Sequence, residues 1–240
     1  MFREVLDSTM VLARREADEG ASHGTLVLAE EQTAGKGRKG RAFYSPRGEN
    51  LYLTIVLRCP FEVHKLLPLA VPLAVCLGVA AQGVDAAIKW PNDVWVAGRK
   101  LSGMLIDAEL SSTGGLAMVG IGINVNGDPT TIPEIAAIAT SMRNETGRHV
   151  PREALLAAVC NELEAALRLS PGALVERYRA ASLVIGKEVW ITPVTGEAYA
   201  GVAESVADDG SLMVVDAQGG RRPLSAEEVT LRPFGGVAPL

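Results

Sequence analysis

The sequence is poor in cysteine and histidine, and this scarcity excludes several classes of protein. Its 240 residues include 3 cysteines and 3 histidines, and Cys59, Cys76 and Cys160 lie far apart. Disulfide frameworks and zinc sites use paired, closely spaced ligands, so neither is predicted. Cys76 and Cys160 lie in apolar runs, which predicts buried, reduced thiols and a cytoplasmic location.

Long apolar segments are scarce as well. Residues Met1 to Asp7 contain no apolar core typical of a signal peptide. The apolar run from Leu66 to Ala81 is shorter than the roughly 20 residues that cross a bilayer, and it contains Pro68 and Pro72. We expect a buried helix lying across a sheet, with one of these prolines in its first turn, and no membrane partner.

Basic residues are in a minority overall. The net charge is -5 at pH 7, whereas nonspecific DNA binding requires a broad basic surface. DNA is therefore not an expected partner. Hydrophobic residues make up 48% and charged residues 21%, which is typical of a folded globular protein. The length suffices for one core, or for one core plus a small satellite domain.

One local segment departs from this acidic background. Residues 33–41, TAGKGRKGR, combine three glycines with four cations and contain no acidic residue. Glycine lets a ligand approach the main chain closely, and clustered cations repel one another until an anion arrives. The segment predicts a mobile loop that becomes ordered over a phosphate-bearing ligand, with a solvated basic loop as the alternative. Its spacing does not fit a P-loop, and a turn and a strand follow it rather than the helix of a dinucleotide fingerprint.

The order of predicted elements indicates an α+β fold. A helix starts at Met10, and a residue of Asp7-Ser8-Thr9 is expected to cap it. Helices are also predicted at Pro151–Leu169 and Pro171–Ala181. Short turns, including Ser112 to Gly115, favour mostly antiparallel strand neighbours. The predicted strands are Thr25–Ala29, Leu51–Leu57, Ala86–Trp90, Val94–Ala97, Lys100–Leu110 and Leu116–Asn126. We expect the last of these to be an edge strand available for pairing in a homodimer.

The pattern changes after Val184. From Lys187 to Leu231 the chain alternates short strands with turns such as Val194-Thr195-Gly196 and Asp208-Asp209-Gly210. Five short strands in this space predict a small β-barrel. The predicted domains are 1–185 and 186–240.

Three further segments place a cation or glycines in strands. Lys89 ends a predicted strand in KWPND and is costly to bury without an anion, although a snorkelling surface lysine is the alternative. Gly103 and Gly122 lie inside predicted strands, where glycine often marks close approach by a ligand or another backbone. Asn124 offers both a hydrogen-bond donor and an acceptor. Asp93 is interpreted as a turn-forming residue rather than a metal ligand.

Together these segments resemble the biotin protein ligases. The matching segments are Asp7–Thr9, Gln32–Arg41, Lys89–Asp93, Arg99–Leu105 and Gly120–Val125, in the family's order. The resemblance implies a catalytic domain similar to class II aminoacyl-tRNA synthetases, with a mixed, mostly antiparallel sheet and helices packed on it. Residues Gly210-Ser211-Leu212 look like the family's C-terminal SH3-like barrel.

The resemblance implies a two-step reaction. Biotin and ATP give biotinyl-5′-AMP, and a lysine of a biotin carboxyl carrier domain then takes the biotin. Lys89 and Arg38 are the implied catalytic residues. The implied biotin-binding residues are Ser8, Thr9, Met10, Gln32, Lys36, Gly37, Arg38, Lys89, Gly103 and Gly122. The implied ATP-binding residues are Arg38, Arg41, Lys89 and Asn124, with Mg²⁺ on the phosphates and no metal ligand assigned.

Two positions depart from the family pattern. Met10 stands where asparagine is usual, so its side chain makes no polar contact with biotin. Lys36 stands where arginine is commoner, and lysine lacks the planar bidentate fork. Because Asp7-Ser8-Thr9 lies so near the first residue, the expected protein is a monofunctional ligase without an N-terminal DNA-binding domain, either monomer or homodimer. The alternatives are a lipoate ligase or octanoyl transferase of the same fold, and a noncatalytic biotin or adenylate sensor.

Overall fold

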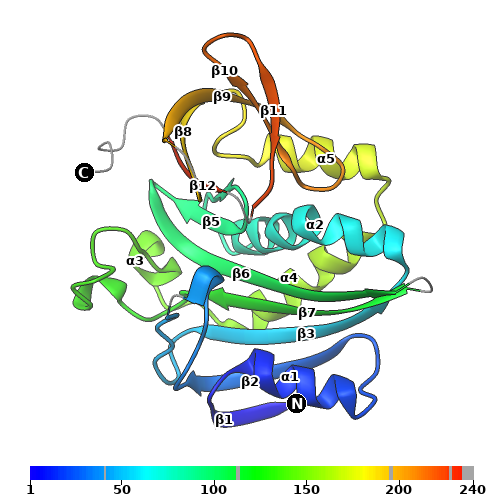
Figure 1. Cartoon of the computed structure of the whole chain (residues 1–240). Helices are drawn as coiled ribbons and strands as arrows, with labels where there is room; N and C mark the ends of the chain where they lie inside the picture. Colours follow the sequence, from blue (N-terminus) through cyan, green and yellow to red (C-terminus); the bar gives the residue numbers. More distant parts are fainter. Residues whose placement is uncertain (41, 112–113, 195–196, 227–228, 234–240) are drawn as a thin grey trace.

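The computed structural model describes residues 1–40, 42–111, 114–194, 197–226 and 229–233, and it contains two sheets. The larger sheet has seven strands in the order β1-β2-β3-β7-β6-β5-β4, and the smaller has five in the order β11-β10-β9-β8-β12. Figure 1 shows the larger sheet crossing the lower part of the molecule and the smaller sheet above it, over α2 and β5. The fold is therefore α+β, as predicted.

The larger sheet is mostly antiparallel, which confirms the prediction. Among the described strands β1 and β2 pair in parallel, while the other neighbours in this sheet run antiparallel. Its strands are β1 (Phe2–Leu6), β2 (Thr25–Gln32), β3 (Leu51–Cys59), β4 (Ala87–Lys89), β5 (Asp93–Val96), β6 (Arg99–Ser111) and β7 (Gly114–Ile123). Strand β1 was not predicted from the sequence. Residues 112 and 113 of the predicted β6–β7 turn lie outside the described residues.

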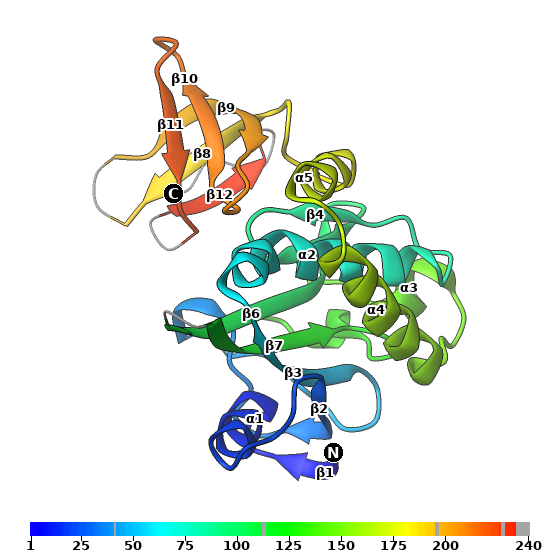
Figure 2. The same ribbon diagram turned by 90° about the vertical axis from the view of Figure 1, so that its right-hand side faces the viewer.

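Helices cover both faces of this sheet (Figure 2). The helices are α1 (Thr9–Asp18), α2 (Phe61–Ala80), α3 (Met142–Thr146), α4 (Arg152–Leu167) and α5 (Pro171–Ala180), with short 3₁₀ turns η1 (Arg38–Gly40) and η2 (Pro129–Thr131). Helix α1 packs on Val27, Val56 and Met118. Helices α2, α4 and α5 share the main core with Leu53 and Ile55. Because successive strand residues point to opposite faces, these two sets of contacts lie on opposite sides of the sheet.

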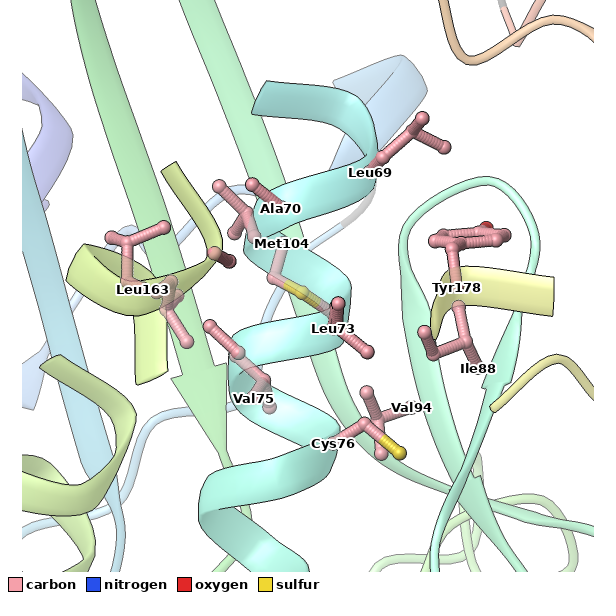
Figure 3. Packing of buried hydrophobic residues seen from close by; sticks show 14 of the residues in the cluster. Leu69, Ala70, Leu73, Val75, Cys76, Ile88, Val94, Met104, Leu163 and Tyr178 are labelled. Atoms are coloured by element: carbon pink, nitrogen blue, oxygen red, sulfur yellow. The ribbon is translucent and has the colours of Figure 1, made fainter. Parts of the chain in front are cut away.

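Helix α2 is the centre of the core. Figure 3 shows Leu69, Leu73 and Cys76 on this helix packed toward Ile88 and Tyr178. By length and composition α2 would be able to cross a membrane, since an 18-residue stretch of it has a mean hydropathy of 1.8, but 72% of that stretch is buried within the protein. This confirms the predicted buried helix.

The predicted start of α2 was wrong. The helix begins at Phe61, so Pro68 and Pro72 lie inside it rather than in its first turn. The apolar run marks only the part of the helix that faces the core. The helix starts five residues before Leu66, and those residues include the charged Glu62 and Lys65, so the apolar run did not mark its start.

The predicted edge strand was also wrong. Strand β7 lies between β3 and β6, and the edges of the sheet are β1 and β4. The outer side of β4 is in turn partly covered, because the Ile88 amide donates to Ala181 O (2.8 Å) and the Leu183 amide donates to Ile88 O (2.7 Å). The glycine-rich strand β7 is thus a central strand, paired along its length with β3 on one side and β6 on the other.

The C-terminal region forms the five predicted strands. They are β8 (Glu188–Pro193), β9 (Tyr199–Val206), β10 (Leu212–Asp216), β11 (Arg221–Leu224) and β12 (Val229–Pro233). Gly210 and Gly219, in the turns that flank β10, have φ angles of +83° and +80°, which glycine adopts without strain. Thr195 and Gly196 of the predicted β8–β9 turn lie outside the described residues.

Candidate functional site

One row of aligned residues crosses five strands of the larger sheet. Tyr52 on β3 pairs with Gly122 on β7, Gly122 with Gly103 on β6, Gly103 with Asp93 on β5, and Asp93 with Lys89 on β4. Directly opposed residues point to the same face of a sheet. The sequence therefore places a cation, a carboxylate and two glycines in line on one face, the face opposite α2.

The glycines of this face form a strip of backbone on which side chains from other parts of the chain rest closely. We call Gly103, Gly120 and Gly122 the glycine floor. A Cβ atom at Gly122 would lie 2.4 Å from the Phe43 ring, and one at Gly120 would lie 2.7 Å from Met10 Sδ. A side chain at either position would have to displace these groups. At Gly122 the group that approaches is a side chain from the segment after the basic loop, whereas the prediction was a ligand or another backbone.

One end of the glycine floor is lined by hydrogen-bonding groups. Gln32 Oε1 accepts from the Thr9 amide (2.9 Å) and from Thr9 Oγ1 (3.1 Å), and Gln32 Nε2 donates to Ser45 Oγ (3.1 Å). Thr54 Oγ1 on β3 donates to Thr9 Oγ1 at 2.9 Å. Thr54 pairs with Gly120 across β3 and β7, so the network borders the floor. Sequence reasoning brought Thr9 and Gln32 to one site, and the structure places them in contact.

Ser8 occupies the N-cap position of α1 and is buried. Its side chain makes no capping hydrogen bond with the described part of the chain. The Ser8 amide instead donates to Asp7 Oδ1 at 2.6 Å. The prediction that this polar segment precedes the first helix is confirmed, while side-chain capping by Ser8 is not observed.

The basic loop joins β2 to β3, which are antiparallel neighbours, as predicted. Arg38 extends from η1 across the site: its Nη1 donates to Asn92 Oδ1 at 3.0 Å, and its Nη2 donates to the Ala226 carbonyl oxygen. Lys36 is exposed and Gly37 is half-buried. Arg41 lies outside the described residues. Arg38 therefore links the loop to the segment that follows Lys89 and to the C-terminal region.

Lys89 stands at the end of edge strand β4. Its Nζ lies 4.1 Å from the centroid of the Trp95 ring, a distance at which the ring's electron-rich face attracts a cation. The turn beyond it is fixed by Asn92, whose Nδ2 donates to Met104 O at 2.5 Å and whose carbonyl accepts from the Met104 amide at 3.0 Å. The cation is thus held at one border of the site on a rigid turn.

Lys100 is a third cation of the site, after Arg38 and Lys89, and sequence reasoning assigned it no role. Its Nζ lies 2.7 Å from Asp93 Oδ1, and a Cβ at Gly103 would lie 2.8 Å from that Nζ. Simple alternation along β6 would place Lys100 and Gly103 on opposite faces. A register shift in the β5–β6 pairing between Val94 and Trp95 reverses this, because a bulge re-aims the side chains beyond it. The sequence feature that could have identified Lys100 is its place three residues before a glycine inside a strand.

Asn124 lies just beyond β7, and its Nδ2 donates to Thr140 O at 3.0 Å. It lines a cavity of about 290 Å³ together with Tyr44, Asn50, Asp128 and Arg143. The cavity adjoins the end of the strand that carries Gly120 and Gly122. Asn124 therefore lines a cavity next to the end of β7, and neither Thr9 nor Gln32 lines that cavity.

The cysteines supply no activated nucleophile. Burial raises the pKa of the Cys76 thiol to about 11, and burial also raises the pKa of Cys59 and of Cys160. A raised thiol pKa keeps sulfur in its unreactive, protonated form at neutral pH. Cys76 is buried as predicted, whereas Cys160 is only partly buried. Within the described ranges no group of three or more His, Cys, Asp or Glu side chains is placed to hold a metal ion.

Comparison with known proteins shows which family the chain resembles. Residues 2–126 match the model of the biotin/lipoate A/B protein ligase family. A biotin–[acetyl-CoA-carboxylase] ligase of Paracoccus denitrificans is 34% identical over 245 residues, which cover 96% of this chain and 98% of the relative.

Two solved structures share the fold along nearly the whole chain. The biotin protein ligase of Aquifex aeolicus in complex with biotin and ATP superposes with a TM-score of 0.79 and 29% identity, covering 97% of this chain and 98% of that one. The biotin protein ligase of Leishmania major in complex with biotinyl-5-AMP gives a TM-score of 0.66 and 26% identity, covering 94% and 98%.

The fold, the aligned site and these similarities define one class of protein, the ligases that attach a carboxylate cofactor to another protein. The chain belongs to the biotin/lipoate A/B protein ligase family.

Proposed function

We propose that this protein is an ATP-dependent biotin protein ligase. The observation that supports this best is a single sheet face that joins a hydrogen-bonding end, a backbone floor and a cationic end. The first is the Thr9–Gln32 network, the second is the glycine floor, and the third is formed by Arg38, Lys89 and Lys100. A flat, polar-headed carboxylic acid fits such a surface, with its carboxylate toward the cations.

The first step joins two anions. A carboxylate oxygen of biotin attacks the α-phosphorus of ATP, the new O–P bond forms, the bond to the β-phosphate oxygen breaks, and pyrophosphate leaves. The chain supplies cations and fixed orientation for this step rather than a nucleophile. Lys100, held by Asp93 over the floor, is placed to stabilise charge at the carboxylate. We assign Arg38 to the same region, and Lys89 to its border beside the Asn92 turn.

The second step needs a nucleophile from a partner. The amine of a carrier lysine attacks the acyl carbon of biotinyl-5′-AMP, an amide forms, the acyl C–O bond breaks, AMP leaves and the amine releases a proton to solvent. The partner is a biotin carboxyl carrier domain of a biotin-dependent carboxylase. DNA and membranes are not expected partners, and monomer and homodimer stay open as predictions.

Several finer assignments belong to the same proposal. Ser8, Lys36 and Gly37 border biotin, and Asn124 and Arg41 hold the nucleotide, with Asn124 facing the cavity beside it. Mg²⁺ accompanies the phosphates of ATP, and no protein ligand is assigned to it. The five C-terminal strands form an SH3-like domain from residue 186, and the enzyme works in the cytoplasm.

The decisive experiment incubates the purified protein with biotin, MgATP and a carrier domain. Mass spectrometry is expected to show one added biotinyl group on the carrier, and a coupled assay is expected to show pyrophosphate release. Parallel reactions with lipoate and octanoate test the related ligases of this family. Transfer of lipoate or octanoate in preference to biotin would contradict the proposal, as would biotin binding without pyrophosphate release, which would indicate a sensor.

A further inference from the structure

Two later parts of the chain contact the segment that contains Lys89, the residues just after α5 on one side and the turn between β9 and β10 on the other. Before it, the Ile88 amide donates to Ala181 O at 2.8 Å, and the Leu183 amide donates to Ile88 O at 2.7 Å. After it, Trp90 Nε1 donates to Gly210 O at 2.9 Å. Lys89 is therefore flanked by residues that are each bonded to chain beyond residue 180.

The Trp90–Gly210 contact is a buried, specific one. Trp90 is only 2% exposed, and a buried indole N–H requires an acceptor because water cannot replace it. That acceptor is a carbonyl in the turn between β9 and β10. The same turn rests on α2, since a Cβ at Gly210 would lie 2.9 Å from Pro68 Cβ. The turn thus fits between the core helix and the tryptophan next to the cation.

We propose that Trp90 is a positioning residue through which the Asp208–Gly210 turn sets the place of Lys89 in the active site. The inference rests on the proposed ligase function, in which Lys89 stabilises charge on reacting oxygens. Asn92, two residues after Trp90, accepts a hydrogen bond from Arg38. A displaced Trp90 would therefore disturb both Lys89 and Arg38. The Thr9–Gln32 network lies at the other end of the sheet and depends on none of these contacts.

Two glycines provide a matched pair of variants. Gly210 and Gly219 have nearly equal φ angles, +83° and +80°, so alanine introduces the same backbone strain at each. Only at Gly210 does the new Cβ meet another element, Pro68, while at Gly219 no atom lies within 4 Å. Gly210→Ala therefore shifts the docked turn, and Gly219→Ala controls for strain in the same sheet. Trp90→Phe removes the N–H donor while keeping an aromatic ring.

The experiment measures pyrophosphate release for the parent, Gly210→Ala, Gly219→Ala and Trp90→Phe. Gly210→Ala and Trp90→Phe are expected to lower kcat by about tenfold, since displacement of a reacting group by about 1 Å costs up to a hundredfold in rate. The KM for biotin is expected to stay within about twofold of the parent, because the hydrogen-bonding end of the site is untouched. Gly219→Ala is expected to keep the parental kcat. Equal kcat values for Gly210→Ala and Gly219→Ala, or an effect carried by the biotin KM, would overturn the inference.

A second readout separates this inference from the ligase proposal. NMR signals of the Lys89 backbone amide and of the Trp90 indole N–H report the contact without turnover. Both are expected to shift in Gly210→Ala and to stay in place in Gly219→Ala. Unshifted Lys89 and Trp90 signals in Gly210→Ala would refute the coupling even in an active enzyme. A parent that releases no pyrophosphate would refute the ligase function, and the NMR comparison would still decide the coupling.

Discussion

Removal of the Lys89 ammonium is a direct test of the charge assignment. In Lys89→Ala, the fold is expected to persist, because the lost contact with the Trp95 ring stabilises a partly exposed cation by only about 0.5–1 kcal/mol. The effect on the rate of adenylate formation is expected to be larger than this effect on stability. Loss of a charged hydrogen bond to a developing anion costs about 1.5–3 kcal/mol, which corresponds to a decrease of about 10- to 150-fold in adenylate formation.

Lys65→Ala is the control for this variant. Lys65 Nζ lies 4.3 Å from the Phe61 ring centroid, so it makes the same kind of contact in the first turn of α2, outside the proposed site. Pyrophosphate release and denaturant unfolding are measured for both variants. Both are expected to lose similar, small stability, and only Lys89→Ala is expected to lose activity. Near-parental pyrophosphate release by Lys89→Ala would show that Lys89 has no role in the reaction.

Three further predictions use other contacts of the structure. In Lys100→Met, the Asp93 carboxylate loses its partner cation. We therefore expect kcat to fall at least about tenfold and the free energy of unfolding to fall by about 1 kcal/mol. Unchanged steady-state kinetics would exclude the role given to Lys100. In Gly122→Ala, the new methyl group displaces the Phe43 ring, so the biotin KM measured by pyrophosphate release should rise at least about fivefold, and an unchanged KM would place biotin elsewhere. Burial raises the pKa of the Cys76 thiol from 9.0 to about 11. The stability that the buried, protonated thiol contributes is therefore fully present below pH 9 and is lost as the pH rises toward 11. Urea titrations at pH 8 to 11 should therefore show a smaller alkaline loss in Cys76→Ala than in the parent, and equal losses would argue against a buried thiol.

Most of the helices and strands could be predicted from local sequence patterns. The alternating strands and the helices that start after Pro151 and at Pro171 appear near their predicted places, because turn residues and periodicity act over a few residues. The position of a strand within a sheet is not a local property. Strand β7 was expected at an edge, and it lies between β3 and β6. Which strands pair on its two sides depends on residues far apart in the chain.

The site was only partly predictable for the same reason. Thr9 and Gln32 were identified through a family resemblance, and the structure brings them into contact. Lys100 was missed because a β-bulge changes which face its side chain occupies. The bond from Arg38 to Ala226 joins residues 188 positions apart, and no spacing rule in a single sequence predicts such a pair. Contacts of this kind depend on how whole sheets dock.

Helix α2 has a consequence for the synthesis of the chain. It is apolar enough to be mistaken for a membrane segment, and in the finished protein α4 (Arg152–Leu167) and α5 (Pro171–Ala180) cover it. On a ribosome, α4 starts to emerge roughly 70 residues after α2, a delay of about 4–14 s at ordinary rates of translation. During that interval β3, already made, and then β4, β5, β6 and β7 are the native elements able to shield the helix. Variants that slow pairing of β6 with β7 are therefore expected to reduce the yield of folded protein more than their effect on the final stability, because they prolong the exposure of α2 to chaperones and to other nascent chains.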